Sequence, residues 1–428
     1  MNEPRTKPPL AATATRLGPA FDLLANYRAG GFFFERRGVG VAGAGVAARV
    51  RTPGGAGRTM RLGRMAIAAL AEIRTSDGSP SPVAVGALPF DDGSPAELVI
   101  PERAVVRREE GETWRLDVVP EGLAPLDADR ERWTGRAMPF AAFADIQLRP
   151  DPEPDEYATA VAVATERIRR GRLRKVVLAR SLLVDAEREL DVKQLLWRLR
   201  AVDPDCFAFA AAEMDLDPSI EGSGGVLVGA TPELLLRKRG SELRATPLAG
   251  SAPRYGDAQR DRAAAERLFA SAKDREEHRF VVEDVAKVLG GFCDDLVHPK
   301  EPELLGTANV WHLATPFEGR LHAAETPVLE IVDALHPTAA VCGAPRDDAR
   351  EALEELEPID RGCYAGPVGW TDANGDGEWA VALRCAEITG TTARLFAGAG
   401  IVEDSVPEAE VDETERKFLA LLDSLRWG

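Results

Sequence analysis

The chain has 428 residues, enough for one large domain or for two to three ordinary ones. Apolar residues make up 45% of it and charged residues 29%, which is typical of globular proteins that fold in water. The net charge of −17 argues against nucleic acid and anionic membranes as partners, and an anionic substrate would need a locally cationic site.

The cysteines and the apolar runs indicate the compartment. No apolar run approaches the roughly 18 residues that a membrane span requires. The first residues lack the apolar core of a secretory signal, and we expect residues 1–15 to form a flexible tail. Five cysteines without CxxC spacing predict reduced thiols in a cytoplasmic protein and no zinc site: Cys206, Cys293, Cys342, Cys363 and Cys385.

Residues 16–150 predict a β-rich N-terminal region. Between Phe21 and Val118, short β-favouring runs are broken by Gly, Pro and charged turns. One segment inside this region, Met60–Ile73, has helical periodicity.

Three glycines in this region match the pattern GxGxxG: Gly38, Gly40 and Gly43. A dinucleotide site would need a helix directly after this pattern. The residues that follow alternate like a strand instead, so the pattern does not predict such a site.

A helix and a strand follow the β-rich region. Residues 149–157 are proline-rich and acidic, and indicate either a linker between domains or the approach to a helix. Apolar spacing predicts that helix over Tyr157–Arg170, with Gly171 at its C-terminal cap. The next strand, residues 173–184, alternates and places Lys175 within an apolar run.

A second strand, residues 224–240, is interrupted at Thr231–Pro232. Because Pro is poorly tolerated within a central strand, we expect a bend that re-aims Glu233.

Two helices carry acidic stripes, the first predicted over Asp257–Leu289 and the second at the end of the chain. Residues three and four apart share a helix face. The residues that do so are Asp274 and Glu277 on the first helix and Glu410, Glu413 and Lys417 on the second. Two interpretations stay open: solvated faces with incidental pairing, or carboxylates that together bind Mg²⁺.

Between these helices the chain predicts a hairpin and an anion site. Residues 372–378 are glycine-rich and lie between two predicted strands, which predicts a hairpin turn. They resemble a calcium-binding loop, but such a loop would need a carboxylate at its twelfth position, which is Leu383. In the following strand Arg384 shares a face with alanines, which leaves room for a ligand. Gly398 and Gly400 then form a turn whose backbone N–H groups suit an anion.

Two single residues suit acid–base chemistry. Burial of Lys175 would favour its neutral form and make it a base, whereas a lysine at a sheet edge would extend to solvent. Glu233 follows a strand-breaking Pro and precedes three leucines, a setting that raises a carboxyl pKa as a general acid requires; the alternative is a structural hydrogen-bond acceptor. HExxH, GxSxG and the P-loop pattern are absent, which excludes the commonest hydrolase and nucleotide-transfer sites.

Several long strings, taken together, resemble the chorismate-utilising enzymes, most closely the isochorismate synthases. The strings include KVVLAR (175–180), GATPELLLRK (229–238), SAKDREEH (271–278), LHPTAAVCGAPR (335–346), GEWAVALRCAEI (377–388) and FAGAGIVEDSVPEAEVDETERK (396–417). The resemblance implies an α/β (α+β) fold with antiparallel sheets packed on each other and helices outside. It also implies that residues 16–428 form a single chorismate-binding domain, with residues 16–150 supplying strands to its core and residues 155–427 carrying the catalytic motifs.

The resemblance also implies roles for individual residues. Lys175 matches the base that activates water to attack C2 of chorismate, and Glu233 matches the acid that protonates the departing C4 hydroxyl. The matched metal positions are Glu277 and Glu413 as Mg²⁺ ligands, with Asp274 and Glu410 behind them. The matched substrate positions are Gly250, His312, Ala340, Tyr364, Arg384, Gly398 and Lys417.

A few positions favour one reaction within the family. Ala249 stands where aminodeoxychorismate synthases carry a lysine nucleophile, and Ala340 stands where anthranilate and salicylate synthases usually carry threonine. Val341 and Cys342 depart from the leucine and serine of many isochorismate synthases, and Val341 leaves some pyruvate elimination open. We therefore expect an Mg²⁺-dependent isochorismate synthase; the alternatives are a salicylate synthase, anthranilate synthase component I and a catalytically silent chorismate-binding protein.

The expected setting follows from the same resemblance. The substrate is chorismate, and the product feeds menaquinone or catecholate siderophore synthesis. We expect a cytoplasmic monomer without an obligate protein partner. A silent homologue would be expected to lack at least one of Lys175, Glu233, Glu277 and Glu413, and all four are present.

Overall fold

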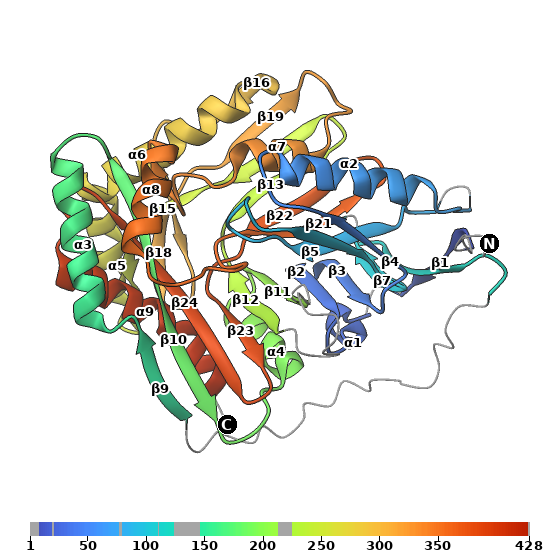
Figure 1. The fold of residues 1–428 in the computed structure, drawn as a ribbon, viewed down its shortest axis with the longest axis horizontal. Helices are drawn as coiled ribbons and strands as arrows, with labels where there is room; N and C mark the ends of the chain where they lie inside the picture. The colour runs from blue at the N-terminus through green and yellow to red at the C-terminus, as the bar shows by residue number, and fades with distance from the viewer. Residues whose placement is uncertain are drawn as a thin grey trace, which may run out of the picture.

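The computed structural model describes residues 8–18, 21–76, 79–109, 111–123, 146–212 and 225–426. Within them the chain forms three antiparallel sheets with helices packed against them (Figure 1). The prediction of an α/β fold built from antiparallel sheets is confirmed. No helix among these residues combines the length and the apolar character needed to cross a membrane.

The large sheet contains strands from both ends of the chain. Its order is β1 (Leu10–Leu17), β8 (Thr113–Pro120), β7 (Arg103–Arg107), β3 (Val39–Ala44), β2 (Phe32–Arg36), β11 (Phe207–Ala212), β12 (Val226–Thr231), β23 (Cys385–Thr389), β24 (Thr392–Ile401), β10 (Lys175–Ala186) and β20 (Gly343–Ala344), with β9 (Ile146–Asp151) also paired to β10.

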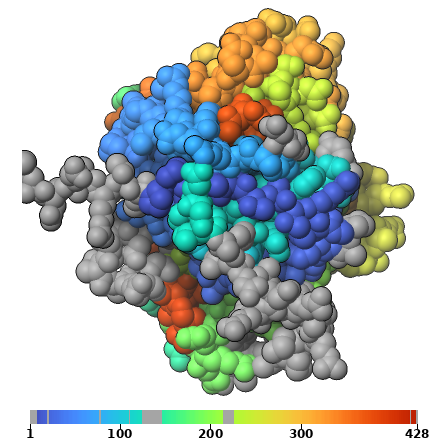
Figure 2. Space-filling view, turned by 90° about the vertical axis from the view of Figure 1, so that its right-hand side faces the viewer, coloured from blue at the N-terminus to red at the C-terminus, as the bar shows by residue number. Residues whose placement is uncertain are grey.

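The second sheet likewise combines strands from distant parts of the chain. Its order is β16 (Cys293–Val297), β19 (Phe317–Leu321), β14 (Glu242–Thr246), β13 (Leu234–Arg239), β22 (Gly377–Val381), β21 (Pro367–Asp372), β5 (Val83–Ala87), β6 (Ala96–Ile100) and β4 (Ala48–Thr52). A third sheet has the order β15 (Leu248–Pro253), β18 (Val310–Ala314) and β17 (Glu303–Gly306). Figure 2 shows the blue and cyan N-terminal segments lying directly against orange C-terminal ones.

The helices are α1 (Leu23–Asn26), α2 (Arg58–Ala71), α3 (Pro154–Arg169), α4 (Val192–Val202), α5 (Ala258–Ala270), α6 (Ala272–Leu289), α7 (Val328–Leu335), α8 (Arg346–Leu356) and α9 (Pro407–Arg426). The predicted helices over Met60–Ile73 and Tyr157–Arg170 are confirmed as α2 and α3. Residues 149–157 are the approach to α3, whose first turn is fixed by Pro154 and by reciprocal capping between Glu153 and Glu156.

The core explains why the large sheet is covered on both faces. Successive side chains of a strand point to opposite faces. In β2, Phe34 enters the main cluster between the two larger sheets, together with Trp379 of β22. Its neighbour Phe33 enters a second cluster on the other face, where Leu196 of α4 and Leu421 of α9 pack.

The structure corrects four expectations. The tail prediction is wrong for residues 10–15, because Leu10–Leu17 is strand β1 and pairs with β8; residues 1–7 lie outside the described residues. The helix predicted over Asp257–Leu289 is two helices, because Ser271 is extended and its hydroxyl accepts a hydrogen bond from the Asp274 N–H, which starts α6.

The third correction concerns Gly398 and Gly400. They do not form the predicted turn, because both lie within strand β24 and pair with Ala179 and Val177 of β10. The fourth correction concerns Arg384 and is described with the site.

Candidate active site

Two neighbouring chain crossings between the larger sheets build the centre of the site. Strands β12 and β23 pair in the large sheet, and their continuations β13 and β22 pair in the second sheet. The first crossing is Pro232–Glu233, which confirms the predicted bend. The second is residues 382–384, so Arg384 is not part of a continuous strand as expected; its φ of +49° belongs to the turn between β22 and β23.

Backbone hydrogen bonds hold the two crossings side by side. The Val381 N–H donates to the carbonyl of Glu233 at 3.1 Å, and the Ala230 N–H donates to the carbonyl of Arg384 at 3.2 Å. A carboxyl group and a guanidinium group that lie 151 positions apart in the chain are therefore neighbours in the fold.

A cavity of about 90 Å³ opens at these crossings. Ten of the predicted site residues line it: Glu233, Gly250, Glu277, His312, Ala340, Tyr364, Arg384, Gly398, Glu413 and Lys417. Lys175, Asp274 and Glu410 do not line it and lie behind it.

Two glycines let helix α6 approach the strands at this cavity. Gly250 has a φ of +75° at an irregularity of β15, and a Cβ there would lie 3.1 Å from Asp274 Cβ. A Cβ on Gly400 of β24 would lie 2.0 Å from Glu277 Oε1 and 3.1 Å from Lys175 Cε. Any side chain at position 400 would therefore displace both groups.

Glu233 is held protonated at neutral pH. Its carboxyl group is buried, and this burial raises its pKa to about 8, although Lys175 and a hydrogen bond from the Leu248 backbone act in the opposite direction. The direction matches the prediction made from its strand-breaking neighbour. Its role as the general acid stays a prediction.

Arg384 gives the cavity a cation that forms no ion pair with any carboxylate in the described part of the chain. Burial lowers its pKa, although the charge of Asp203 acts in the opposite direction. It donates a hydrogen bond to His312 Nε2. Because arginine can only donate, that nitrogen is the acceptor of a neutral imidazole, consistent with the pKa of His312, which burial and Arg384 lower well below its usual value. The pair is suited to an anionic ligand.

Lys417 is the second cation that faces the cavity. Its Nζ donates to the carbonyl of Gly398 at 2.8 Å and to Glu413 Oε1 at 2.7 Å. Burial acts to raise the pKa of Glu413, but the charge and hydrogen bond of Lys417 outweigh it and hold that pKa below its usual value. Two residues of the stripe predicted on the last helix, Glu413 and Lys417, therefore line the cavity, and the third, Glu410, is buried behind them.

The remaining acidic residues are each placed against a lysine or against one another. Lys175 is fully buried, and its Nζ lies 3.1 Å from Glu277 Oε1. Lys273 lies 2.7 Å from Glu410 Oε1. Burial raises the pKa of Asp274 and of Glu410, and neighbouring glutamates raise both further. The cluster thus carries an excess of negative charge that a bound cation would relieve.

No group of three or more His, Cys, Asp or Glu side chains in the described ranges is arranged to hold a metal ion. Besides Glu233, two acidic residues among those described line the cavity, Glu277 and Glu413, one from each helix. Such a set fits Mg²⁺, which prefers oxygen ligands and commonly keeps several waters or substrate oxygens beside one or two carboxylates. It fits poorly with metals that need a full protein cage.

The sequence did not single out three polar residues of the site. Arg361 lines the cavity and is buried. Ser251 contributes a hydrogen bond to Glu413, and Lys273 binds Glu410. An arginine beside Asp360 and a lysine beside Asp274 look like ordinary surface charge in a linear pattern, so no local signal distinguishes them.

Comparison with known proteins gives consistent matches over most of the chain. The family profile described as chorismate binding enzyme matches residues 14–426. Isochorismate synthase DhbC of Bacillus subtilis is 38% identical over 94% of this chain and 94% of its own length. Isochorismate synthase EntC of Escherichia coli is 39% identical over 83% of this chain and 84% of its own. A solved structure from Bacillus anthracis, assigned as a 2,3-dihydroxybenzoate-specific isochorismate synthase, has a TM-score of 0.80 at 35% identity and covers 94% of this chain and 98% of that one.

Proposed function

This chain belongs to the chorismate-binding enzyme family, and we propose that it converts chorismate to isochorismate. In this isomerisation the oxygen of a water adds to C2 of the ring, the two ring double bonds shift, and the C4 hydroxyl leaves with a proton as water. The observation that carries the proposal is a protonated Glu233 in the same cavity as Arg384, a half-buried cation that forms no ion pair with a carboxylate of the described residues. The product then feeds menaquinone or catecholate siderophore synthesis.

Glu233 supplies the proton for the departing hydroxyl. A general acid works best when its pKa lies near the operating pH, and the pKa of about 8 meets that condition. Arg384, oriented by His312, and Lys417, held by Gly398, bind the carboxylates of the substrate and thereby set its ring against Glu233.

Lys175 takes the proton of the attacking water. Lys175 belongs to β10. Gly400 of the paired strand β24 has no side chain, and the space between the Lys175 side chain and the cavity is therefore left open.

Mg²⁺ is part of the proposal. Glu277 and Glu413 are the side chains that would hold it, with Asp274 and Glu410 as the charged groups behind them. When bound, the ion would neutralise a substrate carboxylate beside these acidic side chains. Lys417, which contacts Glu413, offsets part of the same negative charge.

The cellular compartment and the oligomeric state are further parts of the proposal. We expect the enzyme to act in the cytoplasm as a monomer, without a protein partner. None of the five cysteines forms a disulfide, in agreement with a reducing compartment. Size-exclusion chromatography with light scattering tests the oligomeric state.

Product analysis tests the reaction. Purified protein with chorismate and Mg²⁺ should form isochorismate without ammonia or an amidotransferase. A specific observation keeps salicylate synthase as the second candidate. Val341 lines the cavity beside Ala340, and valine is smaller than the leucine of many isochorismate synthases, which leaves room around the substrate ring. Salicylate formed with release of pyruvate would replace the first proposal by the second.

A further inference from the structure

Arg361 lines the cavity but is not available to bind an anion as Arg384 is. Its Nε and Nη2 donate to the two oxygens of Glu357 at 2.6 and 2.7 Å. Its Nη1 donates to the carbonyl of Val341 at 2.8 Å, and Nη2 donates again to the carbonyl of Val177 at 2.7 Å. Four of the five N–H groups of the guanidinium are thus used within the protein.

These bonds join two walls of the cavity. Val341, next to Ala340, belongs to residues 338–342, a segment without strand or helix that we name the wall segment. Val177 belongs to β10, two positions after Lys175. The partner carboxylate of Glu357 also accepts a hydrogen bond from the Ala179 N–H of β10 at 2.8 Å. The Arg361–Glu357 pair therefore fastens the wall segment to the strand that carries Lys175.

The pair is buried and covered from the side away from the cavity. The side chains of Arg361 and Glu357 are only 5% and 4% exposed. The ring of Phe90 covers the guanidinium, with its centroid 4.3 Å away, and the Phe90 N–H donates to the Gly362 carbonyl at 2.8 Å. Displacement of Arg361 toward solvent would have to move this ring.

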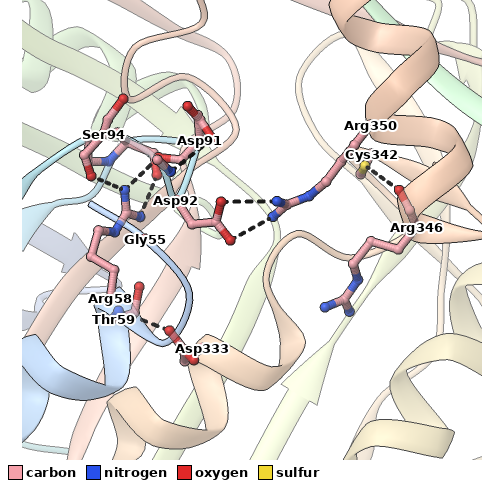
Figure 3. A network of polar contacts seen from close by, with 12 residues as sticks. Gly55, Arg58, Thr59, Asp91, Asp92, Ser94, Asp333, Cys342, Arg346 and Arg350 are labelled. Atoms are coloured by element: carbon pink, nitrogen blue, oxygen red, sulfur yellow. Dashed lines mark hydrogen bonds and ion pairs between the residues drawn. The ribbon is translucent and has the colours of Figure 1, made fainter.

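The loop that carries Phe90 is itself fixed by a polar network (Figure 3). Arg58 of α2 donates to the carbonyls of Pro89, Asp91 and Ser94 at 2.9, 2.6 and 3.0 Å. Arg350 of α8 binds both oxygens of Asp92 at 3.0 and 3.3 Å. The N-terminal region thus reaches the active site through Phe90 and Arg361.

We propose that Arg361, paired with Glu357 and covered by Phe90, is a positioning residue that sets the place of Ala340 and Val341 in the active site. This inference rests on the proposed function for its catalytic consequence. A static wall keeps the ring aligned with acid and base, and a misplacement of about 1 Å can cost on the order of 100-fold in rate.

The central variant is Arg361→Lys, which keeps the charge but cannot make the fork to Glu357 and both carbonyl contacts. In hydrogen-exchange mass spectrometry, peptides that cover residues 338–342 should exchange faster than in the wild type. The kcat should fall by about 10- to 100-fold, with a smaller change in KM, because the substrate cations are intact. Phe90→Leu retains the Arg361–Glu357 pair. It should also accelerate exchange at residues 338–342 and lower kcat, but by less than Arg361→Lys.

The matched control is Glu355→Gln on α8. Glu355 forms an exposed ion pair with Arg167 of α3 and has no contact with Arg361 in the structure. It should leave exchange at the wall segment and the kinetic constants unchanged. A second control is Leu70→Ala, a core truncation in α2 that lowers stability away from the site. It should reduce the melting temperature without accelerating exchange selectively at residues 338–342.

Two results would overturn the inference. One is a folded Arg361→Lys protein whose wall segment exchanges as slowly as in the wild type. The other is Leu70→Ala showing the selective acceleration at residues 338–342 that we expect of Arg361→Lys. If wild-type protein does not isomerise chorismate, the proposed function fails, and the exchange measurement still decides whether Arg361 fixes the wall segment.

Discussion

Replacing Glu233 by Gln should change how stability depends on pH. The folded protein holds this carboxyl with a pKa of about 8, whereas the group has a pKa of 4.5 without burial. The folded state therefore binds the proton more tightly than the unfolded state does. The sign follows from linkage: the contribution is fully present below about pH 4.5 and is lost as the pH rises toward about 8.

The magnitude follows from the same two values. Each pKa unit corresponds to about 1.4 kcal/mol, so the full difference is on the order of 5 kcal/mol. Between pH 5 and pH 8 the wild type should lose about 3.5 kcal/mol of unfolding free energy through this one group. Gln at position 233 cannot ionise, and the variant should not show this loss.

Denaturant unfolding of both proteins at several values between pH 5 and pH 8 measures the effect, and Glu355→Gln serves as a control that should follow the wild type. Gln also cannot donate a proton to the leaving hydroxyl, so the variant should lose about 10²- to 10⁴-fold in kcat. Stability curves of wild type and Glu233→Gln that run parallel across this range would refute the burial argument for Glu233.

Three further predictions concern the base, the metal and the cation. Lys175→Ala should abolish turnover and leave chorismate binding measurable by calorimetry, because the substrate cations remain; full activity in this variant would contradict the assignment of the base. EDTA should remove activity and Mg²⁺ should restore it, and an enzyme insensitive to the chelator would contradict the metal assignment. Arg384→Gln should weaken chorismate binding by about 10- to 100-fold, the value of one or two charge-assisted hydrogen bonds. It should not lower the melting temperature, because no carboxylate of the described residues forms an ion pair with this arginine. A variant that binds chorismate normally would show that Arg384 does not hold the substrate.

The arrangement of this site shows what local patterns determine. The i, i+3, i+7 spacing placed Glu410, Glu413 and Lys417 on one helix face, and helix geometry alone guarantees that. Pro232 removed a backbone donor from a strand, so a break before Glu233 followed from its chemistry. The hairpin between β21 and β22 and the helices α2 and α3 likewise reflect turn residues and apolar periodicity.

Contacts between distant segments were decided only by the tertiary structure. Ser271 looks like one more residue of a long helix until its hydroxyl caps α6, and residues 10–15 look like a tail until β8 pairs with them. The role of Arg361 depends on carbonyls from two other segments, and neither carries any mark in the sequence. The hydrogen bonds of Arg361 depend on which groups the fold buries together.

The sequence by itself therefore determined the chemical groups, their helix and strand faces, and, through resemblance, the family. Only the tertiary structure decided which face meets a cavity, because burial and neighbouring charge are properties of the packed chain. Those two properties give Glu233 its pKa of about 8 and leave Arg384 without an ion pair to any carboxylate of the described residues.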